Sequence, residues 1–316
     1  MSILPMRPLG FGEVLDGAIQ LYRRDFWRYY LIGLIATFAS FLMGAFIDVS
    51  TLMEALAAMT IMSESEEPDF QTMASILSDL VPVFLAGLVS SLLTWYSVLA
   101  TTAAMADRVE GGSVNVGRAF VTALERTPSA LGATLTIIVA GLVVMVVFGL
   151  FAFLVTAILA GTGTVGVIAV VVIVVIGMAI GLLMTMLGAG LSVAVLPPVV
   201  VEKCGPFAAI GRLFSLARGS WLKVIGVMVV SLVVLWLVTT AASLFTGLPV
   251  IFSTPEDYDV GPLQWALANA AAYVVTPLAL PFLAGGFLVL FHDLRVRSEG
   301  FDIEMMAGSI ASRDER

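Results

Sequence analysis

Few residues in this sequence could do chemistry, and most of them lie near the ends of its apolar runs. The chain has one cysteine, Cys204, and one histidine, His292, which excludes an internal disulfide and a zinc site built from these two residue types. The apolar runs contain no paired aspartates, no Ser–Lys pair and no His-Glu-x-x-His motif. We therefore predict a protein with no catalytic residues, no cofactor and no metal.

One polar pair falls inside a long apolar run. Asn269 and Thr276 lie close to Pro277 and Pro281, and each proline frees a backbone carbonyl of a helix. Such a group could bind a substrate or an ion. The favoured interpretation is that the amide hydrogen-bonds a neighbouring helix and that the prolines shape a kink.

Composition indicates the solvent of the elements that carry these residues. The 316 residues are 60% hydrophobic and 12% charged, which excludes an ordinary soluble domain. A bilayer core of about 30 Å needs about 20 apolar residues for one helix. We predict an all-α, polytopic membrane protein with six transmembrane helices. Their uncharged runs lie near 29–47, 81–106, 129–160, 165–201, 224–252 and 263–291.

Basic residues indicate how these helices are oriented, because the cytoplasmic segments of membrane proteins are rich in Lys and Arg. With both termini in the cytoplasm, all 15 basic residues fall on the inner side. The charged residues of the outer segments are then all acidic. We therefore predict a prokaryotic inner-membrane protein with a cytoplasmic N-terminus and C-terminus. The net charge of −8 reflects acidic outer segments, so it does not indicate a nucleic-acid partner.

Three amphipathic stretches, before the first, third and fifth runs, indicate an internal repeat. Gly-Arg-x-Phe-x-x-Ala occurs at 117–123 and 211–217, and Arg-x-x-Trp occurs at 24–27 and 218–221. Each stretch has the polar periodicity of a helix at the membrane surface. We predict one membrane domain over 1–292 and a short cytoplasmic tail over 293–316. The domain would consist of three units, near 7–106, 113–200 and 205–292, each with an interfacial helix and a transmembrane hairpin.

Three segments carry a family resemblance. They run from Arg7 to Arg24, from Glu202 to Trp221 and from Asp293 to Asp302. In this order they resemble the membrane domain of glycerophosphoryl diester phosphodiesterase membrane-domain proteins, a prokaryotic family with six membrane helices. His292 departs from the tyrosine that usually precedes Asp-Leu-Arg in that family. The resemblance implies the fold and no activity, because no soluble stretch of this sequence is long enough for the phosphodiesterase domain.

Ten charged residues in these segments form the candidate site. Arginine suits bidentate contacts, so these charges could bind a cytosolic partner or lipid phosphates. They could instead pair with one another and lock the helical units together, which is the favoured interpretation. The set is Glu13, Asp16, Arg24, Glu202, Arg218, Asp293, Arg295, Arg297, Glu299 and Asp302.

The pattern as a whole predicts a non-enzymatic membrane protein. It would act as an accessory or scaffolding subunit of an inner-membrane assembly, or as a protein that organises lipid. The expected partners are membrane phospholipids and a protein in the membrane or at its cytoplasmic face. The alternative is a transporter or channel for a neutral or apolar solute, which would need a water-accessible cavity near Asn269 and Thr276.

Overall fold

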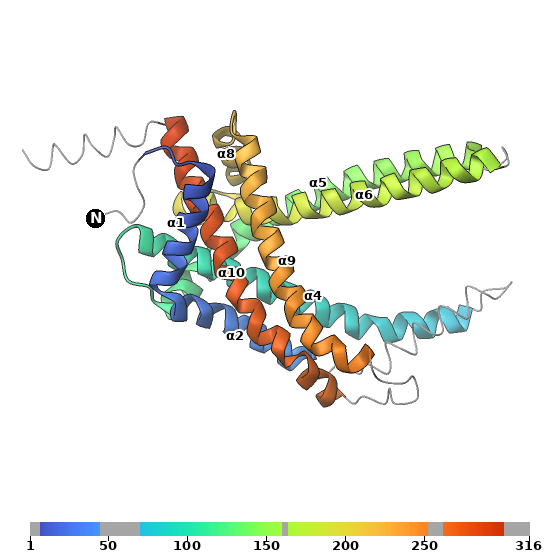
Figure 1. The fold of residues 1–316 in the computed structure, drawn as a ribbon, viewed down its shortest axis with the longest axis horizontal. Helices are drawn as coiled ribbons and strands as arrows, with labels where there is room; N and C mark the ends of the chain where they lie inside the picture. The colour runs from blue at the N-terminus through green and yellow to red at the C-terminus, as the bar shows by residue number, and fades with distance from the viewer. Residues whose placement is uncertain (1–6, 45–69, 160–163, 252–261, 300–316) are drawn as a thin grey trace, which may run out of the picture. The chain divides into compact units, whose positions relative to one another are not determined.

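A computed structural model describes residues 7–44, 70–159, 164–251 and 262–299 of the chain. These residues are 91% helical and include no strand, so the all-α prediction is confirmed for them (Figure 1). The helices are α1 (Phe11–Arg24), α2 (Phe26–Gly44), α4 (Phe70–Val109), α5 (Val116–Leu159), α6 (Thr164–Ala194), α7 (Leu196–Val201), α8 (Pro206–Leu216), α9 (Trp221–Ile251) and α10 (Pro262–Glu299).

Five segments of the described chain are long and apolar enough to cross a bilayer, as expected of a multi-pass membrane protein. They are Met73–Val109, Val116–Ile158, Val170–Val201, Trp221–Ala242 and Tyr273–Glu299. The helix α2 is apolar and shorter, and it covers most of the first predicted span. The long uncharged runs of the sequence therefore correspond to helices.

The three predicted interfacial helices have different outcomes. The first and third are the separate helices α1 and α8. Their helical structure is interrupted at Asp25 and near Gly219. Gly219 has a φ of +83°, a conformation that glycine adopts without strain. The second is the beginning of α5, which continues through Pro128 without a break. Here the prediction of a separate helix is wrong, since α5 is one helix from Val116 to Leu159.

The chain forms two compact units. The described residues of the first lie in 16–123 and 233–285, and those of the second lie in 7–15, 124–232 and 286–299. Within the first unit, α2 packs against α4. It also contacts α10, where the Tyr30 hydroxyl donates to the Val274 carbonyl at 3.1 Å and Gly33 lies against Pro277.

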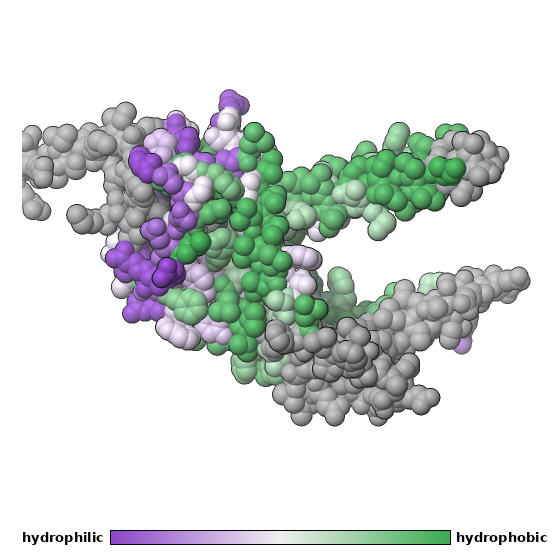
Figure 2. All heavy atoms as spheres, viewed as in Figure 1, coloured by the Kyte–Doolittle hydropathy of each residue, from purple (hydrophilic) through white to green (hydrophobic). Residues whose placement is uncertain are grey.

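Within the second unit, α5 and α6 lie side by side and antiparallel (Figure 1). Gly177 of α6 faces Phe148 of α5, and a small residue at this position lets the two helices approach closely. The other end of α6 packs on α9, where a β-carbon on Gly190 would overlap Met228. The described surface of the α5/α6 pair is hydrophobic along its length (Figure 2).

Burial differs sharply between the membrane-length helices. In α10, 72% of the most apolar stretch is buried inside the molecule, whereas none of that stretch is buried in α5 or in the α6–α7 segment. The buried stretch of α10 is therefore surrounded by other helices. The α5/α6 pair presents its side chains to whatever surrounds the protein.

Candidate functional site

Seven charged residues of the second unit gather around the C-terminal end of α10 in two clusters. We call the first the Asp293 cluster, which consists of Asp293, Lys223, Arg297 and the backbone of Leu9. We call the second the Glu202 ring, which consists of Glu202, Arg212, Arg295 and Glu299. Residues four apart share a helix face, and those two apart point in nearly opposite directions. The last turns of α10 therefore present one pair of charges to each cluster.

The centre of the Asp293 cluster is a carboxylate with a solvent exposure of 0%. The Leu9 backbone N–H donates to Oδ1 at 2.6 Å, and Lys223 Nζ donates to Oδ2 at 2.6 Å. Arg297 Nε lies 3.1 Å from both oxygens. A buried charge is tolerated when it is paired and hydrogen-bonded, and this carboxylate meets both conditions.

The two cations of the Asp293 cluster also hold the other side of the Leu9 backbone. The Leu9 carbonyl accepts a hydrogen bond from Lys223 Nζ at 2.5 Å and one from Arg297 Nη2 at 2.5 Å. Both polar backbone groups of Leu9 are therefore satisfied by side chains from α9 and α10. The arrangement fastens the segment before α1 to the ends of two long helices.

Local packing explains why Leu9 reaches this position. Phe11 lies on α9 against Gly226, where an added β-carbon would come within 2.8 Å of its ring. Glu13 accepts a hydrogen bond from the Gly10 N–H at 2.6 Å, the capping-box contact that orders the beginning of a helix. This backbone hydrogen bond, helped by Arg7 at 2.5 Å, lowers the pKa of Glu13. These contacts lie outside the Asp293 cluster, and they order the first turn of α1.

The Glu202 ring alternates acidic and basic side chains. Arg212 binds Glu202 through Nε at 2.6 Å and Nη2 at 2.7 Å, and it also pairs with Glu299. Arg295 Nε closes the ring, at 3.2 Å from Glu202 and 3.3 Å from Glu299. The four charges sum to zero, and they join the chain after α7 to α8 and to α10.

The contacts in the ring shift the pKa values of the side chains that make them. Burial raises the pKa of Glu202, but the hydrogen bonds from Arg212 and the charges of Arg212 and Arg295 outweigh it, so the pKa is lowered overall. The hydrogen bond to Glu202 raises the pKa of Arg212. Burial also raises the pKa of Cys204, whose thiol donates to Glu202 at 3.8 Å. This cysteine stays protonated at neutral pH, which argues against a role as a nucleophile.

The ten predicted site residues separate into four groups. Glu202, Asp293, Arg295, Arg297 and Glu299 lie in the two clusters, and Glu13 makes the local capping contacts. Asp16, Arg24 and Arg218 are exposed. Asp302 lies outside the described residues. The pairing of charges with one another therefore describes half of the predicted set.

Sequence reasoning did not include Lys223, Arg212 and the Leu9 backbone in the site. A signal was present for Lys223, one of only two lysines in the chain, because it stands at the beginning of an apolar run. Arg212 belongs to the repeated Gly-Arg-x-Phe motif. A backbone contact made by an apolar residue such as Leu9 leaves no signature in the residue types.

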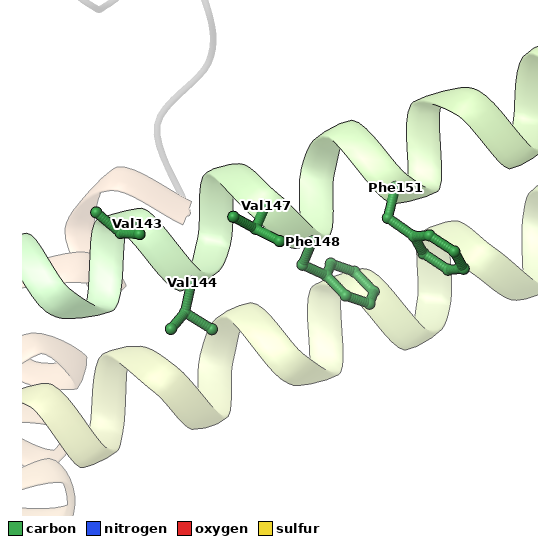
Figure 3. A pocket seen from close by; sticks show the side chains of 5 residues that line it. All are labelled: Val143, Val144, Val147, Phe148 and Phe151. Atoms are coloured by element: carbon green, nitrogen blue, oxygen red, sulfur yellow. The ribbon is translucent and has the colours of Figure 1, made fainter.

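The predicted intramembrane pair lies on α10, which continues as one helix through Pro277 and Pro281. The Asn269 side chain is outside the described part of the structure, and Thr276 is half-buried. An apolar groove of about 420 Å³ lies elsewhere, on the exposed α5/α6 pair (Figure 3). Its walls are Val143, Val144, Val147, Phe148 and Phe151, all from α5. These side chains offer no group that could orient or activate a polar substrate.

No group of three His, Cys, Asp or Glu side chains in the described ranges is arranged to hold a metal ion. Comparison of the chain with protein-family models, with curated proteins and with solved structures found no match. The functional conclusion therefore depends on the geometry of the site and of the membrane-length helices.

Proposed function

We propose that this chain is a non-enzymatic membrane protein that serves as an accessory or scaffolding subunit of a membrane assembly. The observation that carries the proposal is the mutual pairing of charges at the end of α10. Catalytic groups converge on a space that a substrate can enter, with hydrogen-bonding capacity left for it. In the Asp293 cluster that capacity is spent on the Leu9 backbone, so the charges act as fasteners.

The α5/α6 pair supports the scaffolding role. Large apolar residues along both helices are exposed, among them Leu150 at 60% and Phe151 at 64%. A soluble protein rarely carries such an apolar surface, and a bilayer or another membrane helix would cover it. Small residues between α5 and α6 hold the pair together, so its outer faces remain available for a neighbour.

We further propose that α2 is a sixth membrane helix and that both termini are cytoplasmic, in the inner membrane of a prokaryote. The 19 residues of α2 span about 28 Å at 1.5 Å per residue, close to the hydrocarbon thickness. Six crossings place every basic residue on one side, and the family resemblance supports the same topology.

Extraction from the native membrane tests the proposed function. The tagged protein is purified in mild detergent, and the complex is analysed by native mass spectrometry. We expect a stoichiometric membrane protein partner or tightly bound anionic lipid. A monomer with neither, and with the same thermal stability in every lipid composition, would contradict the proposal.

A matched pair of variants identifies the surface used. Leu150→Trp adds bulk to the exposed face of α5, and Leu237→Trp adds the same bulk to an exposed position of α9. Both changes suit a lipid-facing position, so both proteins should fold. The α5 variant is expected to lose the protein partner, and the α9 variant is expected to keep it. Equal retention by both variants would exclude the α5/α6 pair as the docking surface.

A further inference from the structure

A basic surface lies where α1 meets α2, in the first unit. Arg23 and Arg24 form the last turn of α1, and both are exposed. Arg28 follows in α2 with a side chain that is 54% exposed. Among the described residues, neither Arg23 nor Arg24 forms an ion pair. Their charges are therefore available to a ligand outside the protein.

The neighbouring acid does not neutralise this surface. Asp25 has a side chain that is only 11% exposed. Its carboxylate lies 2.9 Å from Arg108 Nε and 3.3 Å from Arg28 Nη1. Asp25 is paired with Arg108 of α4 and Arg28 of α2, so Arg23 and Arg24 retain a local excess of positive charge.

The place of this surface relative to apolar residues indicates the ligand. Trp27 is 75% exposed, and its ring meets those of Phe26 and Tyr30 edge-on at 5.3 and 6.1 Å. The helix that follows is apolar. Exposed tryptophan beside arginine, at the beginning of an apolar helix, is typical of the headgroup layer of a bilayer.

We propose that Arg23 and Arg24 bind the phosphate of an anionic phospholipid in the surrounding leaflet, with Trp27 against its glycerol and upper acyl region. This inference rests on the proposed membrane placement of α2. Guanidinium groups suit phosphate because they donate several hydrogen bonds in a planar arrangement. Arg28 adds positive charge to this surface while it stays paired with Asp25.

Lipid titration of the purified, delipidated protein tests the inference. The variant is R23Q/R24Q, and the control is R118Q/K203Q, which removes two other exposed basic residues. Native mass spectrometry follows binding of phosphatidylglycerol and of phosphatidylcholine. We expect the affinity of the variant for phosphatidylglycerol to fall about 30-fold, since each arginine near an anionic surface contributes about 1 kcal/mol. The control should bind as the wild type does, and phosphatidylcholine should not distinguish the three proteins.

Equal binding of phosphatidylglycerol by the variant and the wild type would overturn the inference. Displacement of the lipid by millimolar inorganic phosphate would also overturn it, because the site would then recognise free phosphate. Loss of a protein partner with unchanged lipid binding would assign the surface to an acidic protein instead. Carbonate extraction of membranes separates these results from a failure of the proposed function, because a chain that is not embedded would be released in wild type and variant alike.

Discussion

The Asp293 cluster and the Glu202 ring share the last turns of α10, yet they differ in burial and in what they hold. The ring has four ion-pair contacts between side chains that are 16 to 30% exposed. The cluster has two ion pairs, around a carboxylate with no exposure, and it holds a backbone segment. Exposed ion pairs contribute little, and a buried charge is costly once it loses a partner. We therefore expect burial, rather than the number of ion pairs, to decide how much each group of charges contributes to stability.

Removal of the buried carboxylate should have the largest effect. Asp293→Ala leaves Lys223 and Arg297 without their counter-charge and the Leu9 N–H without an acceptor. We expect a loss of about 3 to 5 kcal/mol in the free energy of unfolding. Thermal unfolding in detergent, followed by intrinsic fluorescence, measures it. Asp16→Ala, on the exposed face of α1, is the control and should leave the midpoint unchanged.

Removal of one cation from the same cluster should cost less. Lys223→Met keeps most of the apolar stem and removes the hydrogen bonds to Asp293 and to the Leu9 carbonyl. Arg297 still compensates the carboxylate, so we expect a loss of about 2 kcal/mol, in the range for hydrogen bonds to charged groups. The same unfolding experiment applies. A loss as large as that of Asp293→Ala would show that Arg297 does not share the compensation.

A break in the Glu202 ring should cost less again. Glu202→Gln removes the charge that Arg212 and Arg295 both contact, although these side chains stay partly solvated. We expect a loss of about 1 kcal/mol in the free energy of unfolding, near the upper limit for exposed pairs. A loss equal to that of Asp293→Ala would remove the distinction between the ring and the cluster.

The stability that the Glu202 ring contributes should also depend on pH. The pKa of Glu202 is lowered in the folded protein from its ordinary value of 4.5. A lowered carboxyl pKa contributes stability above the ordinary value, and that contribution is lost as the pH falls through the folded value. The stability difference between wild type and Glu202→Gln should thus be constant near neutral pH and shrink below about pH 4.5. A difference that does not change down to pH 3 would contradict this assignment.

The long helices were predictable from the sequence, because an apolar run that is long enough to cross a bilayer indicates a helix surrounded by lipid. The sequence did not predict where each helix begins. The helix α5 begins at Val116, well before its apolar run near Ser129, because hydropathy marks a change of solvent and both stretches are helical. The short helices α1 and α8 end at a local break, and Gly219 is the residue that identifies the second one.

The site was predictable only as a set of charges. Glu202, Asp293, Arg295, Arg297 and Glu299 were predicted as candidates, but residue types do not say which charges will be buried. The Leu9 N–H and Asp293 are 284 residues apart, and no spacing rule connects a backbone N–H to a distant carboxylate. The capping contact of Glu13 is local, so the short spacing from Gly10 to Glu13 could have indicated it.

Hydrogen exchange at the Leu9 amide tests most directly whether the Asp293 cluster fastens the segment before α1. Mass spectrometry of the protein in detergent would compare wild type with Lys223→Met, Asp293→Ala and Glu202→Gln. We expect exchange of the peptide containing Leu9 to accelerate in the first two variants and to stay at the wild-type rate in Glu202→Gln. Equal protection of this peptide in wild type and Asp293→Ala, with both proteins folded, would contradict the account.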